Sequence, residues 1–234
     1  MNSGTKGDTP VDHVDEQILS SRGEILKRYG DLLASYGGKI RLTGPSDPEI
    51  LWNDHILDCL FTVSILPEKG QVLDVGSGGG LPGLVWAICR PDLEVTLLDS
   101  VKKKCGALEE MAAALELPNV RVVWGRCEEY ALRERETFSL AGARAVAGTG
   151  ILLEYLSPFV AVGGTVLAMK GPLYAEELEP LQGRWNRLGL AAPSIVPYGG
   201  DEKRRFLLLW KKNAPCSSRF PRKTGMAEKT FWWR

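Results

Sequence analysis

Residues 72–83 read VLDVGSGGGLPG, and this stretch decides the fold of the chain. It begins as an apolar strand with one acid, Asp74, continues as a glycine-rich turn and predicts a helix with Pro82 in its first turn. Glycines leave backbone N–H groups accessible to a ligand, because they carry no side chain that would hold it away. The stretch therefore predicts the strand-turn-helix cradle in which α/β folds bind nucleotides.

Two nucleotide-binding patterns share these glycines. Gly78, Gly80 and Gly83 match the dinucleotide fingerprint, but that fingerprint normally begins directly after its strand, and here it begins four residues after Asp74. Asp74 also places a carboxylate where it would repel a pyrophosphate and stabilise the cationic sulfonium and ammonium groups of S-adenosylmethionine. The spacing favours S-adenosylmethionine, and a dinucleotide remains the alternative.

A second acid supports an adenosine ligand. Residues 94–99 predict a buried strand that ends in Asp99, 25 residues (99 − 74) after Asp74. At about this interval, an acid at the tip of the second strand binds ribose hydroxyls in nucleotide-binding folds. Asp99 is also suited to start a helix near Val101, and the two roles are compatible.

Apolar strands alternate with helical segments along the rest of the chain. The pattern predicts strands over residues 72–75, 94–99, 120–124, 138–143, 165–169 and 206–210, and helices over 18–36, 48–66, 84–89, 101–115, 151–159 and 174–188. This alternation predicts an α/β, Rossmann-like domain of the class I methyltransferase type, with a mostly parallel seven-stranded sheet and helices on both faces. We expect a helical N-terminal extension over residues 1–66, a cofactor-binding domain over 67–212 and a basic C-terminal tail over 213–234.

Composition limits the class of protein. The 234 residues are 44% hydrophobic, which suits one large domain, and contain no apolar run long enough to span a bilayer. Five scattered cysteines without a Cys-x-x-Cys pair predict reduced thiols in a cytoplasmic protein, and two histidines argue against a metal site.

Charge is unevenly distributed although the net charge is zero. Residues 203–234 carry ten Lys or Arg and one acid, a balance of +9, which leaves −9 on residues 1–202. The same segment contains Phe220, Phe231, Trp232 and Trp233. Cations interleaved with aromatic rings suit phosphate contacts and base stacking, and a solvated tail is the alternative.

Five motifs in order resemble those of the RsmG family, the glucose-inhibited division protein B group. They are residues 74–83, LLDS at 97–100, GRCEE at 125–129, ARAVA at 143–147 and MKG at 169–171. The resemblance extends over roughly residues 29 to 225. It implies a methyltransferase that uses S-adenosylmethionine to modify guanine N7 in 16S ribosomal RNA. Its expected partner is the 16S rRNA or the 30S subunit or precursor, and we expect a cytoplasmic monomer without a metal or membrane contact.

The family's site residues are transferred to the positions that match. Residues expected to hold S-adenosylmethionine and the product S-adenosylhomocysteine are Asp74, Gly76, Ser77, Gly78, Leu81, Asp99, Ser100, Cys127, Glu128 and Arg144. The basic residues expected in the catalytic site, to position RNA and cofactor, are Arg144, Lys170, Arg126 and Lys103. Lys103 and Arg126 are also compatible with ordinary surface charges.

The chain departs from the family pattern in three places. Ser139 replaces an acid upstream of Arg144, Arg41 replaces an Asn, and Cys59 replaces a Ser. Ser139 puts the activity in doubt, because it lies close to Arg144 in the sequence. His55 is expected to be a packing residue more often than a substrate contact.

The chemistry of guanine N7 agrees with the absence of a general-base motif from the sequence. N7 carries an in-plane lone pair and is unprotonated at neutral pH, so methyl transfer requires no general base. The target must be unstacked or in a loop, because the major groove of an RNA helix is too narrow to enter. A methyltransferase of another substrate and a non-catalytic RNA-binding relative remain the alternatives.

Overall fold

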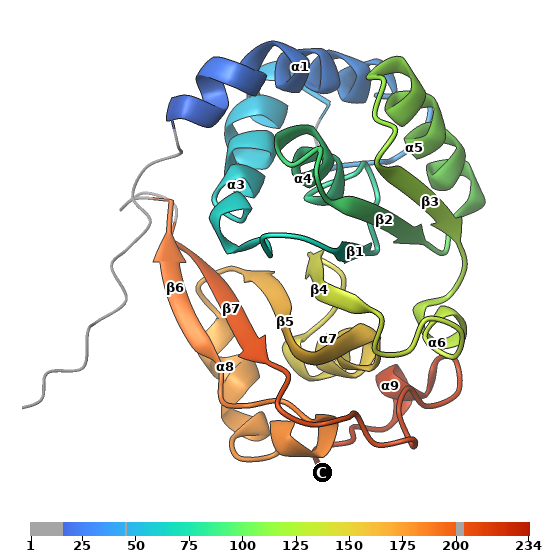
Figure 1. Ribbon diagram of the computed structural model, residues 1–234, viewed down its shortest axis with the longest axis vertical. Helices are drawn as coiled ribbons and strands as arrows, with labels where there is room; N and C mark the ends of the chain where they lie inside the picture. Colours follow the sequence, from blue (N-terminus) through green and yellow to red (C-terminus); the bar gives the residue numbers. More distant parts are fainter. Residues whose placement is uncertain (1–15, 45, 200–203) are drawn as a thin grey trace, which may run out of the picture.

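The computed structural model describes residues 16–44, 46–199 and 204–234, and it contains the expected seven-stranded sheet (Figure 1). The strands are β1 (Gln71–Val75), β2 (Glu94–Asp99), β3 (Val120–Trp124), β4 (Phe138–Arg144), β5 (Val160–Lys170), β6 (Ser194–Tyr198) and β7 (Arg205–Lys211). Their order in the sheet is β3-β2-β1-β4-β5-β7-β6. This confirms the predicted Rossmann-like α/β architecture.

Strands β1 to β5 are parallel, whereas β7 runs antiparallel to both β5 and β6. The order reverses between β1 and β4, so the carboxyl ends of these two strands flank the switch point where such folds bind ligands. The sequence pattern did not reveal β6, because Pro197 lies within it. A proline is tolerated there because β6 is an edge strand.

The helices follow the predicted positions with several differences: the helix expected over 48–66 is divided, the helices at 127–130 and 226–229 were not expected, and two further differences concern Pro82 and residues 174–188. They are α1 (Glu16–Ser35), α2 (Pro48–Ile50), α3 (Leu57–Leu60), α4 (Gly83–Cys89), α5 (Lys102–Ala114), α6 (Cys127–Tyr130), α7 (Thr149–Leu156), α8 (Tyr174–Leu178) and α9 (Met226–Lys229). A π-helical segment over Leu51–Ile56 joins α2 to α3, and short 3₁₀ turns occupy Val63–Ile65, Ser157–Phe159, Glu179–Leu181 and Trp185–Leu188. Within these described residues, no helix is long and apolar enough to cross a membrane.

The last two differences have local causes. Pro82 directly precedes α4 as its capping residue and does not lie in the first turn. The single helix expected over residues 174–188 is instead three short segments. Pro180 occupies the start of the second, and Gly183 adopts a left-handed conformation with φ of 69° before the third.

Each face of the sheet carries its own hydrophobic core. Leu97 and Leu98 are consecutive in β2 and therefore point to opposite faces. Leu97 belongs to the core formed with α1, α3, α4 and α5, whereas Leu98 belongs to the core formed with α7 and the chain after residue 215. Figure 1 shows α1 and α5 on one side and α7 and α9 on the other. The N-terminal and C-terminal segments thus cover different faces.

The segment over residues 213–234 is packed against the sheet domain in the structure. Phe220 and Trp232 are only 5% and 6% exposed, and both belong to the core that includes α7. Phe231 stacks on Trp233 at 4.7 Å between ring centroids. The burial of Phe220 and Trp232 corrects the expectation that all four rings of this segment are available to stack on bases. Residues 1–15 of the expected extension and Lys203 of the basic run lie outside the described residues.

Candidate functional site

The glycine-rich turn between β1 and α4 forms the base of the site. Gly76, Gly78 and Gly80 have φ values of 71°, 56° and 94°, a left-handed region that side chains disfavour. The Gly78 N–H donates to Asp99 Oδ2 at 2.9 Å, which ties the turn to the end of β2. Glycine occupies these three positions because the left-handed backbone conformation there disfavours any side chain.

Asp74 acts within the fold and does not line a cavity. It is fully buried, and its Oδ2 accepts a hydrogen bond from the Gly83 N–H at 3.0 Å. Burial raises the pKa of Asp74 to about 7. A Cβ on Gly83 would collide with Leu97 and the Asp74 carboxylate, which explains the glycine at that position. The structure therefore shows Asp74 supporting the start of α4, and its expected stabilisation of the cofactor, directly or through water, stays a prediction.

Asp99 occupies a similar supporting position at the end of β2. Its Oδ2 accepts from Gly78, and its Oδ1 accepts from the Val101 N–H at 2.8 Å. The side chain is buried and lies behind the cavity walls, whereas its neighbour Ser100 lines a cavity. The role at the start of α5 is present, and the ribose contact stays a prediction.

Two cavities lie on either side of Gly76. The larger has a volume of about 930 Å³ and the smaller about 200 Å³. Gly76 and Val146 line both, so these two residues form a shared wall. A Cβ on Gly76 would lie 2.6 Å from Val146 Cγ2, so the two residues are in close contact. An elongated ligand that crosses Gly76 fits this arrangement, with one end in each cavity.

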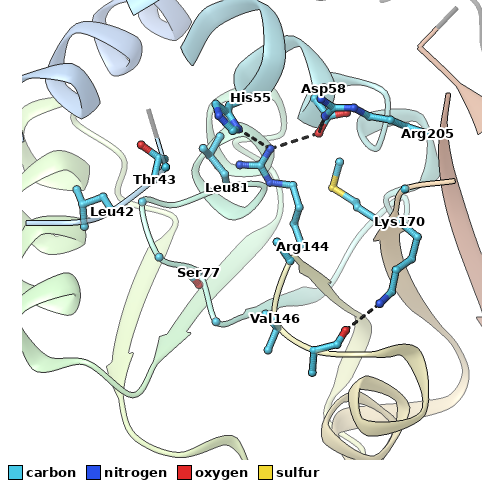
Figure 2. A pocket seen from close by; sticks show the side chains of 18 of the residues that line it. Leu42, Thr43, His55, Asp58, Ser77, Leu81, Arg144, Val146, Lys170 and Arg205 are labelled. Atoms are coloured by element: carbon cyan, nitrogen blue, oxygen red, sulfur yellow. Dashed lines mark hydrogen bonds and ion pairs between the residues drawn. The ribbon is translucent and has the colours of Figure 1, made fainter. Parts of the chain in front are cut away.

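Arg144 lies at the carboxyl end of β4 and forms the centre of the larger cavity (Figure 2). Its Nη1 donates to His55 Nδ1 at 3.0 Å and to Asp58 Oδ2 at 3.3 Å. Because a guanidinium has only donors, Nδ1 of His55 is the acceptor. Arg205, at the start of β7, pairs with the same Asp58 oxygen at 2.6 Å. One buried carboxylate thus orients two arginines.

His55 is part of this cluster and lines the cavity. Burial and the neighbouring Arg144 guanidinium lower the pKa of His55 below its ordinary value of 6.5. The imidazole is therefore neutral at neutral pH, as its acceptor role requires. The expectation of a packing residue accounts for only part of this arrangement.

Lys170 at the end of β5 also lines the larger cavity. Its Nζ donates to the Ala147 carbonyl at 2.8 Å and to Glu177 Oε2 at 2.7 Å. Glu177 Oε2 also accepts from the Thr149 N–H at 2.6 Å. Lys170 therefore fixes the loop that carries Val146, and its charge is balanced at the cavity wall.

Arg126 belongs to the smaller cavity, apart from Arg144 and Lys170. Its Nε lies 3.6 Å from Glu128 Oε2, to which the Cys127 thiol donates at 3.3 Å. Glu128 is buried and does not line this cavity, whereas Cys127 does. The structure therefore places Arg126 apart from Arg144 and Lys170, with which the sequence grouped it.

Lys103 is also separate from that group. It is exposed and lines neither cavity, whereas the next residue, Lys104, lines the larger one. Consecutive helical residues point about 100° apart, so a shift of one position in α5 changes the surface that a side chain faces. The role expected for Lys103 stays a prediction, and Lys104 is the lysine of α5 that lines this wall.

The remaining predicted residues divide between the two cavities. Ser77, Gly78 and Leu81 line the larger cavity, and Ser100 lines the smaller one. Of the departures from the family pattern, Arg41 lines the larger cavity. Cys59 is fully buried.

Ser139 lies at the amino end of β4, five positions before Arg144 and thus at the opposite edge of the sheet. A Cβ on Gly70, just before β1, would lie 2.7 Å from Ser139 Oγ. Five strand residues span about 16 Å, so this position is outside the site. The missing acid therefore does not alter the cavity around Arg144.

Several residues that line the cavities were not identified from the sequence, among them Arg205, Tyr155 and Glu228. Arg205 reaches the larger cavity because β7 is antiparallel, so that its first residue lies at the edge where β5 ends. Tyr155 and Glu228 line the smaller cavity from α7 and α9. The sequence pattern gave no signal for these three residues, because it shows neither the direction of β7 nor the path of the chain after β7.

Comparison with known proteins gives a consistent result. The family described as rRNA small subunit methyltransferase G matches residues 22–206. Ribosomal RNA small subunit methyltransferase G of Moorella thermoacetica is 36% identical over 229 residues, which cover 95% of this chain and 93% of that protein. The protein of the same name from Symbiobacterium thermophilum is 37% identical over 213 residues, or 86% of each chain.

Solved structures support the fold. A 16S rRNA (adenine(1408)-N(1))-methyltransferase from Catenulisporales acidiphilia, crystallised with S-adenosylmethionine, has a TM-score of 0.51 at 18% identity. The match covers 66% of this chain and 89% of that one. A TehB-like methyltransferase from Corynebacterium glutamicum has a TM-score of 0.50 at 15% identity, over 83% of this chain and 99% of its own. At these identities the likeness concerns the fold alone.

Proposed function

The chain belongs to the rRNA small subunit methyltransferase G family, and from this membership we infer that it transfers a methyl group from S-adenosylmethionine to 16S ribosomal RNA. We propose guanine N7 as the acceptor atom. Membership of the family is the basis for the proposed reaction, and the larger cavity supports RNA as the substrate.

The walls of the larger cavity suit an RNA substrate. Five basic side chains line it, against two acids, Asp58 and Glu177. The basic residues are Arg41, Lys104, Arg144, Lys170 and Arg205. Such a surface attracts phosphates, which supply much of the affinity of proteins for nucleic acids. This excess of cations around a cavity beside the glycine turn is the single observation that carries the proposal.

The turn itself is the proposed seat of the cofactor. Gly76 and the shared wall would hold its centre, and Ser100 and Cys127 would border its adenosine end. When bound, S-adenosylmethionine supplies an electrophilic methyl group attached to a positively charged sulfur. Asp74 and Asp99 keep the turn in shape through their backbone hydrogen bonds.

The protein groups act by positioning. Guanine N7 is already a nucleophile at neutral pH, so no side chain has to remove a proton. N7 becomes cationic in the product, and a positive charge aimed at it would oppose the reaction. The Arg144 guanidinium is held in place by its hydrogen bonds to His55 and Asp58. This fixed position suits a contact to a phosphate or to guanine O6.

We further propose that the protein acts in the cytoplasm as a monomer on the 30S subunit or its precursor. The ribosomal substrate and the five free cysteines support this location.

Methylation of purified 30S subunits with isotopically labelled S-adenosylmethionine tests the function. We expect label in 16S rRNA, recovered as N7-methylguanosine by mass spectrometry after nuclease digestion. Label in another nucleoside would refute guanine N7 as the acceptor. Absence of label from RNA would refute the proposal that the protein methylates 16S rRNA.

The Gly76→Ala variant provides a structural control for that assay. Its Cβ would meet Val146 at the shared wall, so we expect transfer to be lost. Gly163→Ala is the matched variant, because Gly163 also has a positive φ, 89°, but has no neighbour within 4 Å of a Cβ. Retention of activity in Gly163→Ala separates loss of the cofactor seat from backbone strain.

A further inference from the structure

The smaller cavity is completed by the chain after residue 213, which we call the C-terminal segment (residues 213–234). The Trp232 indole N–H donates to the Gly150 carbonyl at 2.7 Å, which fixes the segment to the start of α7. A Cβ on Gly150 would collide with the ring of Trp233. The glycine therefore allows the segment to pack directly on the helix backbone.

An ion pair anchors the same segment at a second point. Arg222 Nε donates to Glu154 Oε1 at 2.8 Å, and Arg222 Nη2 donates to Oε2 at 2.6 Å. The backbone N–H of Arg222 donates to Oε1 as well, at 3.1 Å. Glu154 is 1% exposed, so three hydrogen bonds satisfy a buried carboxylate.

A third contact brings the segment to the cavity. The Gly225 N–H donates to Glu128 Oε1 at 3.0 Å, and α9 begins at the next residue. Glu228 of α9 lines the smaller cavity together with Tyr155. The Tyr155 hydroxyl donates to Glu228 Oε1 at 3.3 Å, and the Glu228 side chain is exposed at the mouth of this cavity. Burial raises the pKa of Tyr155, so the hydroxyl stays protonated as a donor.

The position of the two cavities determines which end of the cofactor lies here. The transferred methyl group has to face the RNA base, so the sulfur belongs at the shared wall beside the larger, basic cavity. The adenine ring then occupies the smaller cavity, next to Ser100 and Cys127. This step rests on the proposed function.

Adenine offers one hydrogen-bond donor group, the exocyclic amine, and otherwise ring acceptors. Arg126 and Tyr155 have donors to offer, whereas an ionised carboxylate only accepts. We propose that Glu228 is a specificity-determining residue that accepts a hydrogen bond from the adenine amine of S-adenosylmethionine. The C-terminal segment thereby contributes to cofactor recognition, in addition to packing on α7.

Calorimetry with two ligands tests the proposal without an activity measurement. S-adenosylhomocysteine carries the adenine amine, and S-inosylhomocysteine carries a carbonyl oxygen in its place. We expect the full-length protein to bind S-adenosylhomocysteine at least about tenfold more tightly, because the carboxylate would face an acceptor in the analogue. In Glu228→Ala the affinity for S-adenosylhomocysteine decreases about tenfold, and the preference between the two ligands nearly disappears.

Two further variants make the outcome decisive. Glu228→Gln presents both an acceptor and a donor, so it should bind the inosine analogue better than the wild type does. Lys229→Ala, on the same short helix but lining neither cavity, should leave both affinities unchanged. Thermal melting of each variant checks that the fold is intact.

The result that overturns the proposal is an unchanged preference in Glu228→Ala. Failure of the wild-type protein to bind S-adenosylhomocysteine at all would instead overturn the proposed function. The two failures are therefore distinguishable.

Discussion

The two cavities share one wall and one sheet edge, yet different added segments complete them. The larger is completed by residues 41–44, His55, Asp58 and the start of β7, and the smaller by Tyr155 of α7 and Glu228 of the C-terminal segment. The larger is strongly basic, and the smaller contains one arginine and one acid, Arg126 and Glu228. The sheet thus fixes where ligands bind, and the added segments determine which chemical groups they meet.

The largest effect is expected where the C-terminal segment is anchored. In Arg222→Met the Glu154 carboxylate stays buried without its partner, and we expect the free energy of unfolding to fall by about 3–5 kcal/mol. Chemical denaturation measures this loss. Arg219→Met is the matched control, because Arg219 is exposed and its guanidinium lies over the Phe220 ring at 6.0 Å from the centroid.

The double variant Arg222→Met with Glu154→Met sharpens the result. Replacing both partners with apolar side chains should recover most of the stability, because no charge is then left buried alone. A loss in Arg222→Met no larger than in Arg219→Met would contradict the anchoring role of the pair.

The next effect concerns the larger cavity. Arg144→Gln removes a cation from the RNA side of the shared wall, and we expect kcat/KM for methyl transfer to fall about 100-fold, or about 2.7 kcal/mol. The affinity for S-adenosylhomocysteine should change by less than about twofold, because Arg144 lines the larger cavity and not the smaller one proposed for the adenosine. Single-turnover kinetics and calorimetry measure the two quantities separately.

Arg121→Gln is the control for that variant, since Arg121 has a 55% exposed side chain and lines neither cavity. An equal loss of cofactor affinity and rate in Arg144→Gln would show that the two cavities are not functionally distinct.

The smallest effect is a dependence on pH at His55. Its pKa is lowered in the folded protein, so the unfolded chain takes up the proton at higher pH. The contribution of His55 to the free energy of unfolding is therefore complete above about pH 6.5 and decreases as pH falls through that value toward the folded pKa. Arg144→Gln should move the folded pKa back up, because it removes a positive neighbour.

Nuclear magnetic resonance of the imidazole protons checks this directly. The chain has two histidines, so a His13→Gln background leaves only the signal of His55. Titration of that signal at or above pH 6.5 would contradict the neutral acceptor role.

Sequence predicted the sheet and the glycine turn because both depend on local pattern. Nearly continuous burial of apolar residues marks β1 and β2, and the positive φ angles of Gly76 and Gly78 favour glycine. The broken helix over 174–188 was predictable from Pro180 and Gly183, whose backbone effects are local.

The cavity walls depend on topology, which the sequence pattern does not contain. Arg205 enters the larger cavity only because β7 reverses direction, and Glu228 enters the smaller one only because the segment turns back over α7. Asp74 and Asp99 have the predicted spacing, but burial directs their carboxylates to backbone N–H groups. Composition alone suggested either an RNA-binding or a solvated tail. The structure has a segment packed on the domain through Phe220 and Trp232, and its contact with RNA stays a prediction.

The Arg222–Glu154 pair has a consequence for the order of events during synthesis. Arg222 follows Glu154 by 68 residues, so the ribosome completes α7 well before its ionic partner exists. Until then the nascent protein carries an unsatisfied acid and an open side to the smaller cavity. The smaller cavity is therefore completed late in translation, after the last strand of the sheet, which ends at Lys211, has been synthesised.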